Sequence, residues 1–281
     1  MSATSTPATT SGSLDTALPA GDVSAHNVTL VRVVRSEWIK LRSVRSTIVT
    51  LGLTACAVVA FGVLVSMLSN GAPIAADGEG IYDPAGNSLF GAILAQVVLG
   101  AVGALVITSE YSTGLIRTTL TAVPRRLPVL WAKMIVVAAA SFATMVASLL
   151  VAFFVGQAVY SGGGPSASLS DPGVLRAVLA AALFPTTIAV MGVGFGALVR
   201  HTAAAIGILV AVLFVMPTLF DTLGGVWDDA SKYLPSEAGQ AMITVVKDSG
   251  DMSPTTGLLV LLGWIGALLA AGMIALKRRD A

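Results

Sequence analysis

The sequence carries little charge. Only 11% of its 281 residues are Asp, Glu, Lys or Arg, against about 25% in an average soluble domain. Apolar residues make up 55%, and they lie in continuous runs of about 20 residues, the length of helix that crosses a bilayer core. In lipid every backbone amide must be satisfied internally, so continuous runs predict helices. The composition therefore predicts an all-α membrane protein and excludes a soluble globule.

The sequence is also poor in residues that carry chemistry. Its single cysteine, Cys56, excludes an intramolecular disulfide, and its two histidines, His26 and His201, show no zinc spacing. The net charge of +1 gives no indication of a nucleic-acid partner. The sequence has no GxxxxGK[ST] loop, so we expect neither ATP hydrolysis nor any catalytic, cofactor-binding or metal-binding residue in this chain.

Ionisable residues are nearly absent from the long apolar runs. Arg176 and Lys133 lie near run ends, where a long side chain can reach the interface. Ion-coupled carriers usually place titratable groups near the midplane. If this protein moves a solute uphill, we therefore expect the energy to come from another polypeptide.

The pattern along the chain divides it into two parts. Residues 1–28, rich in Ser, Thr, Ala, Gly and Pro, are predicted to be a disordered cytoplasmic tail. Residues 29–281 form the predicted transmembrane domain. Its six predicted spans are about 47–68, 90–108, 134–159, 174–199, 203–220 and 256–276.

An amphipathic segment precedes the first span. In "LVRVVRSEWIKLRSVRS", Leu30 to Ser46, one helical side holds Leu30, Val34, Trp38 and Leu41, and Arg32, Arg35 and Arg42 lie roughly opposite. This pattern predicts an elbow helix in the plane of the membrane. A basic flank that only sets orientation is the alternative.

Counting basic residues predicts the orientation. With the N-terminus inside, 13 of the 16 Lys and Arg residues are cytoplasmic, and only Arg176, Lys232 and Lys247 are external. The positive-inside rule then places both termini in the cytoplasm.

One cytoplasmic connection is large enough to hold a partner. "TSEYSTGLIRTTLTAVPRR", Thr108 to Arg126, leaves the second span, breaks at Ser112-Thr113-Gly114 and continues into a predicted helix carrying Leu115, Ile116 and Leu120. We expect a Ser or Thr hydroxyl to cap this helix, whose apolar residues suit a partner's groove. A solvated loop between spans is the alternative.

Other features leave two interpretations open. Ala238–Val246 is apolar but too short to cross, so it is either a re-entrant or interfacial helix or a plain surface helix. Gly192 and Gly196 have GxxxG spacing, which serves either packing within the chain or a dimer face. Pro185 and Pro217 predict kinks in spans four and five.

Four segments resemble the permease subunits of ABC-2 type transporters, bacterial exporters whose ATPase is often a separate chain. They are "RSEWIKLRSVRSTIVTL", "GALVITSEYSTGLIRTTLTAVPRRLPVLWAKMI", "YLPSEAGQAM" and the "KRRD" tail. The second segment is the most specific, and the resemblance covers about residues 30–280.

The resemblance implies a dimer of two permease chains above two ATP-binding subunits, which would bind ATP and Mg²⁺. The helix within Glu110–Thr121 would enter a cleft of the ATPase, with the elbow beside it. The resemblance carries over Glu110, Tyr111, Gly114 and Arg117 of the coupling helix and Glu37, Trp38 and Arg42 of the elbow. Together with the apolar residues Leu115, Ile116 and Leu120, they are the predicted docking residues.

The sequence thus predicts a multi-pass permease of the bacterial cell membrane that exports a solute with a separate ATP-binding subunit. The alternatives are a non-transporting membrane sensor or assembly factor, and a channel that works without ATP. The substrate, and whether the dimer is homomeric or heteromeric, stay open at this level.

Overall fold

The computed structural model describes residues 29–69, 84–115, 126–160, 166–245 and 252–278, and these residues are helical with short connections. The helices are α1 (Leu30–Ser43), α2 (Arg45–Ser69), α3 (Pro84–Leu89), α4 (Gly91–Thr113), α6 (Arg126–Tyr160), α7 (Val174–Val199), α8 (Thr202–Val210), the π-helical turn η1 (Ala211–Val215), α9 (Met216–Leu223), α10 (Val226–Ser231), α11 (Pro235–Ile243) and α12 (Pro254–Arg278). The predicted tail, residues 1–28, lies outside the described residues.

The described part of the chain contains six helices or helix pairs that are long and apolar enough to cross a membrane. They run from Arg45 to Ser69, Pro84 to Ser112, Leu127 to Val159, Val174 to Val199, Thr202 to Leu223, and Pro254 to Ala275. All six predicted spans are therefore present. The largest difference is at the third helix, which begins about two turns before the predicted residue 134 and so contains Lys133.

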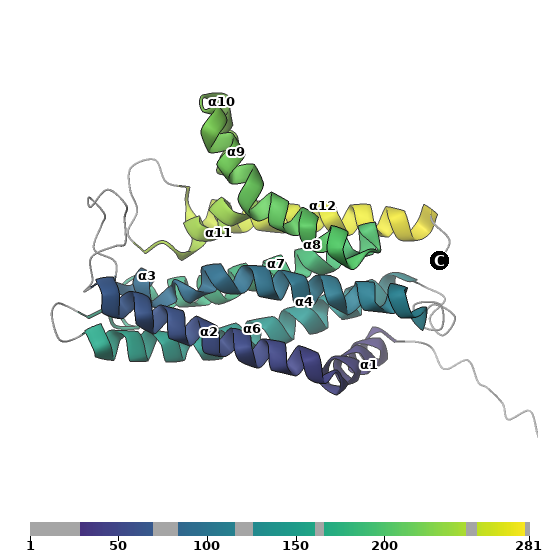
Figure 1. Ribbon diagram of the computed structural model, residues 1–281, viewed down its shortest axis with the longest axis horizontal. Coiled ribbons are helices and arrows are strands. Elements are labelled where there is room, and N and C mark those ends of the chain that lie inside the picture. The colour runs from purple at the N-terminus through teal and green to yellow at the C-terminus, as the bar shows by residue number, and fades with distance from the viewer. Residues whose placement is uncertain (1–28, 70–83, 116–125, 161–165, 246–251, 279–281) are drawn as a thin grey trace, which may run out of the picture.

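Helix α7 forms the centre of the bundle, with α4 packed along it (Figure 1). Most of its residues are buried, whereas most residues of α2, α8–α9 and α12 are partly or fully exposed. Helices α2 and α6 pack beside α4 and α7, and α11 and α12 pack against α7 from another side. The outer helices therefore present the apolar surface that a bilayer requires.

Glycines allow α4 and α7 to approach closely. A Cβ at Gly192 would collide with the carbonyl oxygen of Gly100, and one at Gly103 would collide with that of Ala189. Gly196 likewise faces Ile107 of α4. The GxxxG pair in α7 therefore serves packing within the chain, the first of the two interpretations.

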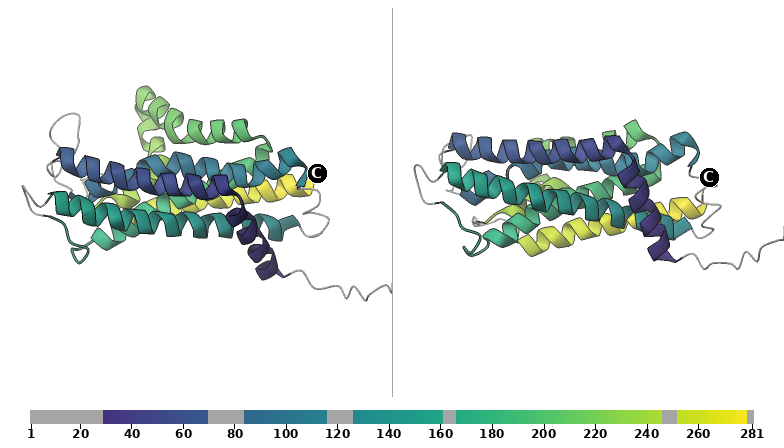
Figure 2. Two further views of the ribbon diagram at one scale, coloured as in Figure 1. Left: turned by 60° about the horizontal axis from the view of Figure 1, so that its bottom comes forward. Right: turned by 90° about the horizontal axis from the view of Figure 1, so that it is seen from below.

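Segments predicted to be cytoplasmic lie together at one end of the bundle. Figure 1 shows α1, the end of α4, the α7–α8 connection and the end of α12 at the right-hand side. Figure 2 shows α1 set at an angle across the bundle rather than parallel to it. This arrangement suits the predicted elbow, although the plane of the membrane remains a prediction.

At the opposite end, α11 is built into the bundle. Gly239 of α11 lies on the ring of Phe184 in α7, and the Cα of Gly257 in α12 lies against the carbonyl of Ala238. Arg176 donates hydrogen bonds to the carbonyl oxygens of Met242 (2.6 Å) and Thr244 (2.7 Å), the end of α11. Helix α11 is therefore packed against two spans. This packing argues against the second interpretation, a plain surface helix.

Span five changes direction midway. The α-helix gives way to the π-helical turn Ala211–Val215, and Pro217 follows within the first turn of α9. Beyond this point α9 and α10 diverge from the rest of the bundle (Figure 1). A π-turn next to a proline is a known cause of helix bending, so the predicted kink at Pro217 has a structural counterpart.

Candidate functional site

Helix α1 packs on the bundle through a narrow stripe. Its buried residues are Val33, Glu37 and Leu41, spaced four residues apart on one helical face. Val33 packs with Val129 and Ala132 at the start of α6. The predicted apolar side is only partly the packed one, because Leu41 is buried while Leu30 and Trp38 are exposed. Those exposed side chains are free to face lipid, as an interfacial helix requires.

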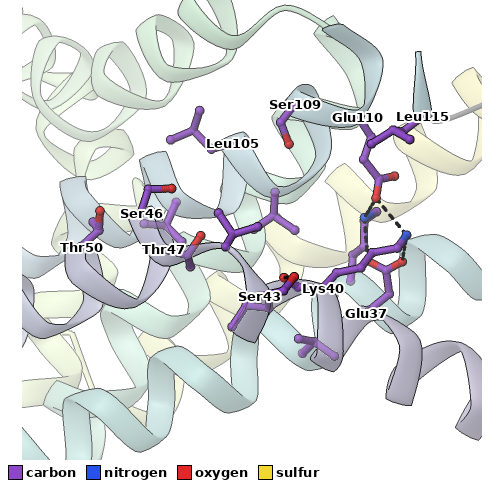
Figure 3. A pocket seen from close by; sticks show the side chains of 16 residues that line it. Glu37, Lys40, Ser43, Ser46, Thr47, Thr50, Leu105, Ser109, Glu110 and Leu115 are labelled. Carbon is purple, nitrogen blue, oxygen red and sulfur yellow. Dashed lines mark hydrogen bonds and ion pairs between the residues drawn. The ribbon is translucent and has the colours of Figure 1, made fainter. Parts of the chain in front are cut away.

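The carboxylate of Glu37 belongs to a buried cluster of four charges. Lys133 of α6 donates to Glu37 Oε2 at 2.6 Å and to Glu110 Oε1 at 2.7 Å. Lys40 of α1 donates to Glu37 Oε1 at 2.7 Å and to Glu110 Oε1 at 3.1 Å. Each ammonium group thus lies between two carboxylates, as Figure 3 shows for Lys40, Glu37 and Glu110. The cluster therefore joins α1, α4 and α6 through charge-assisted hydrogen bonds.

Lys133 is the most deeply buried member. It is 1% exposed, while Glu37 is 4% and Glu110 is 7% exposed. We expected the Lys133 side chain to extend out to the membrane interface, and instead it is buried against α1 and α4. Because α6 begins at Arg126, Lys133 lies about two turns into this helix, where it is buried against neighbouring helices. An unpaired ammonium group in such a place would be costly. Two carboxylates from different helices compensate that charge, and Glu110 Oε2 is buried without a hydrogen-bond partner among the described residues.

Lys40 is the accessible member, with 44% of its side chain exposed. Partial desolvation acts to lower its pKa, but the hydrogen bond and charge of Glu37, together with Glu110, outweigh it, and the pKa of Lys40 is raised. A raised pKa keeps Lys40 protonated at neutral pH. Its contribution to stability is present below the ordinary Lys pKa and is lost only as pH rises through the raised value.

Helix α4 ends at the predicted break. Gly114 follows Thr113 with a φ of +73°, a left-handed conformation that favours glycine at a helix C-terminus. The hydroxyls of Ser112 and Thr113 both donate to the carbonyl oxygen of Ser109 (3.0 and 2.8 Å), so they bond within α4 and not to the chain after Gly114. Leu115 is 56% exposed. Ile116, Arg117 and Leu120 lie outside the described residues.

A second contact fixes the end of α4. The Arg200 guanidinium lies 5.2 Å from the centre of the Tyr111 ring, within the range of a cation–π interaction. One turn earlier, Thr202 donates a hydrogen bond of 2.8 Å to Thr108. Tyr111, predicted as part of the coupling helix, therefore contacts the connection between α7 and α8.

The structure brings together some of the predicted site residues and not others. Glu37 and Glu110 share the charge cluster, although they are 73 residues apart in sequence. Trp38 and Arg42 are exposed and make no hydrogen bond or ion pair to the described part of the hairpin. Lys40 and Lys133 were missed as site residues. The sequence signal that could have found them is the pair of glutamates, Glu37 and Glu110, because a carboxylate buried at a helix end needs a neighbouring cation.

A cavity of about 550 Å³ adjoins the cluster (Figure 3). Its wall comes from α1, the start of α2, α4 and α6. Charged groups of the cluster form one part of the wall, hydroxyls such as Thr47 and Ser109 another, and apolar side chains such as Leu105 and Val136 the rest. The cavity therefore has an amphipathic lining. Among the described residues no group of three or more His, Cys, Asp or Glu could hold a metal ion.

Comparison with known proteins identifies the class. The family described as ABC-2 family transporter protein matches residues 33–218, which is more than half of the chain. The chain therefore belongs to the ABC-2 transporter family, and it is a multi-pass membrane permease. The match includes α1, the charge cluster and the hairpin after α4. No curated protein matches the chain.

Proposed function

We propose that this chain is the transmembrane subunit of an ATP-driven exporter, energised by a separate ATP-binding subunit that docks on the hairpin between α4 and α6. The observation that carries the proposal is the buried charge cluster at the point where this hairpin leaves the bundle. Lys133 ties the end of α4 to α1 and α6 within 2.6–2.7 Å. A displacement of the hairpin by a docked subunit would therefore move α1, α4 and α6 together.

The described geometry supports this route. Glu110 is the last buried residue of α4, and the chain is exposed from Ser112 through Leu115, so the hairpin begins where the bundle ends. The bonds from Arg200 and Thr202 link the same helix end to span five. A rigid connection of this kind transmits a displacement, whereas a solvated loop would absorb it. ATP and Mg²⁺ would be held by the partner subunit, and a second permease chain would complete a dimer in the bacterial cell membrane.

The test is a matched pair of tryptophan substitutions. Gly114→Trp places a large ring at the proposed docking surface, where a Cβ meets nothing within 4 Å. Gly224→Trp is the control, because Gly224 also has a positive φ and open space but lies at the far end of span five. We expect both variants to insert and purify as the native protein does. Only Gly114→Trp should lose co-purification of the ATP-binding subunit and transport-coupled ATPase activity.

Two outcomes would contradict the proposal. If the native chain, co-expressed with the ATP-binding subunit of its own gene neighbourhood, never co-purifies with it, a sensor or a channel becomes the better explanation. If both tryptophan variants transport at the native rate, the hairpin is not the docking surface. Glu110→Lys is a poorer probe, because Glu110 is buried in the charge cluster and its reversal would disturb folding as well as docking.

A further inference from the structure

Four hydroxyl groups on the cavity wall differ from the hydroxyls that bond to their own helix. Ser and Thr side chains in membrane helices usually bond to a backbone carbonyl one turn earlier. Thr54, Thr108 and Thr144 do so, at 2.7 to 2.9 Å. Four other hydroxyls line the cavity and make no hydrogen bond within the described part of the chain. They belong to Ser46, Thr47, Thr50 and Ser109.

A further donor lies beside them. Lys40 uses two of its three ammonium protons on Glu37 and Glu110. Because its side chain is 44% exposed, the third proton is accessible from the cavity side. The polar part of the cavity therefore offers several donors, which fit a ligand with several acceptor oxygens.

The rest of the wall is apolar. Val102, Leu105 and Val106 of α4 face the cavity together with Val136 of α6. Apolar surface of this kind is stabilised by an apolar ligand and gains nothing from a small hydrated anion. The cluster itself, with two lysines and two glutamates, has no net charge to attract a free anion. The occupant therefore needs an oxygen-rich head and an apolar chain.

We propose that this cavity is a phospholipid site. The phosphate and ester oxygens of the head group accept hydrogen bonds from the four hydroxyls and from Lys40, and one acyl chain lies along the valine and leucine wall. A volume of about 550 Å³ falls within the roughly 300–1,000 Å³ of small-molecule sites. It suits a head group and part of a chain. The site lies behind the elbow helix at the end of the spans, where lipid head groups meet the protein.

The test compares lipid retention by purified full-length chains in native mass spectrometry. The native protein should retain about one phospholipid per chain after exchange into mild detergent. Thr47→Val combined with Thr50→Val replaces two hydroxyls by methyl groups of the same shape. The two lost hydrogen bonds predict a retention that is about five- to 150-fold weaker. Thr144→Val is the control, because its hydroxyl bonds to Ala140 within α6, and it should retain lipid as the native protein does.

A second measurement locates the lipid. A phospholipid with a photoactivatable group in one acyl chain, incorporated in vesicles with the protein, should label the 102–106 segment of α4. Thr47→Val with Thr50→Val should lower that labelling while labelling of the exposed face of α12 stays constant. Equal retention and equal labelling in the double variant and the control would overturn the proposal. So would a native protein that retains no phospholipid, or that retains an amphiphile without phosphate. The measurements need no ATP-binding partner, so their outcome is separate from that of the proposed transport function.

Discussion

Lys133 is the residue on which the arrangement of three helices depends. Its ammonium group separates the carboxylates of Glu37 and Glu110, which come from α1 and α4. Lys133→Met keeps the length of the side chain but leaves those two buried carboxylates with only the half-exposed Lys40. Breaking a buried ion pair on one side costs about 3–5 kcal/mol. We therefore expect a markedly lower melting temperature in detergent, measured by differential scanning fluorimetry.

A variant that lacks the three buried charges and keeps only the half-exposed Lys40 separates charge from shape in this cluster. Lys133→Met together with Glu37→Gln and Glu110→Gln removes the unpaired charges, and it should recover most of the lost stability. Lys232→Met is the control, since its ion pair with Asp229 is exposed on both sides, and it should melt as the native protein does. If Lys133→Met and Lys232→Met melted alike, the cluster would not stabilise the fold.

Glu237 gives the protein a second, pH-dependent signature at the other end. Burial raises the pKa of this carboxyl, and the neighbouring charge of Asp221 raises it further. A carboxyl with a raised pKa favours the folded state fully below its ordinary pKa of 4.5, and this contribution is lost as pH rises through the raised value. Glu237→Gln mimics the protonated form at every pH. It should melt higher than the native protein at pH 7 and equally at pH 4.

At the scale of elements, the contact of α4 with α7 depends on glycine. Even a methyl group at Gly192 would meet the carbonyl oxygen of Gly100, which cannot move aside without its helix. Gly192→Ala should therefore destabilise the protein by about 1–3 kcal/mol, the cost of overpacking a core. Gly207→Ala has open space, and a helical Gly→Ala change there should be neutral or stabilise by about 0.5–1 kcal/mol. Opposite signs in thermal melting would confirm the close approach, and equal effects would contradict it.

The elements themselves were predictable because a bilayer leaves few choices. Apolar runs of about 20 residues predict helices, and the fourth predicted span, 174–199, coincides with α7. The start of α6 was placed too late because Lys133 was taken as a residue at the interface. A hydropathy pattern assigns a lone lysine in an apolar run to the end of the span. It contains no information on the two carboxylates, distant in sequence, that compensate the charge.

The candidate site was predictable in part for the same reason. Gly114 and the break after Thr113 follow from local chain chemistry, which a sequence displays directly. The proximity of Glu37 and Glu110 depends on how α1 crosses the bundle. The helical wheel did not reveal it, because it took the side with Leu30 and Trp38 as the packed face. The cavity depends on hydroxyl rotamers and on the separation of α2 and α4. Neither can be predicted from the spacing of residues in the sequence.

For the whole molecule, the open question with the greatest consequence is its orientation. The described ends of α1, α4, α7 and α12 lie together at one end of the bundle (Figure 1). With the N-terminus inside, 13 of the 16 Lys and Arg residues of the sequence fall in segments predicted to be cytoplasmic, and only Arg176, Lys232 and Lys247 fall in external ones. Because loops rich in Lys and Arg stay in the cytoplasm, we predict that the charge cluster faces the cytoplasm, where an ATP-binding subunit could reach the hairpin.

The single cysteine makes this prediction easy to test. Cys56→Ser gives a chain without cysteine, since Cys56 is the only one, and one cysteine can then be placed at the exposed position Ser112 or Asp229. In intact cells a membrane-impermeant maleimide should label Asp229→Cys and leave Ser112→Cys unlabelled. After permeabilisation both should be labelled. The reverse pattern would place the hairpin outside the cell, where no ATP-binding subunit could energise it, and would contradict both the orientation and the proposed transport mechanism.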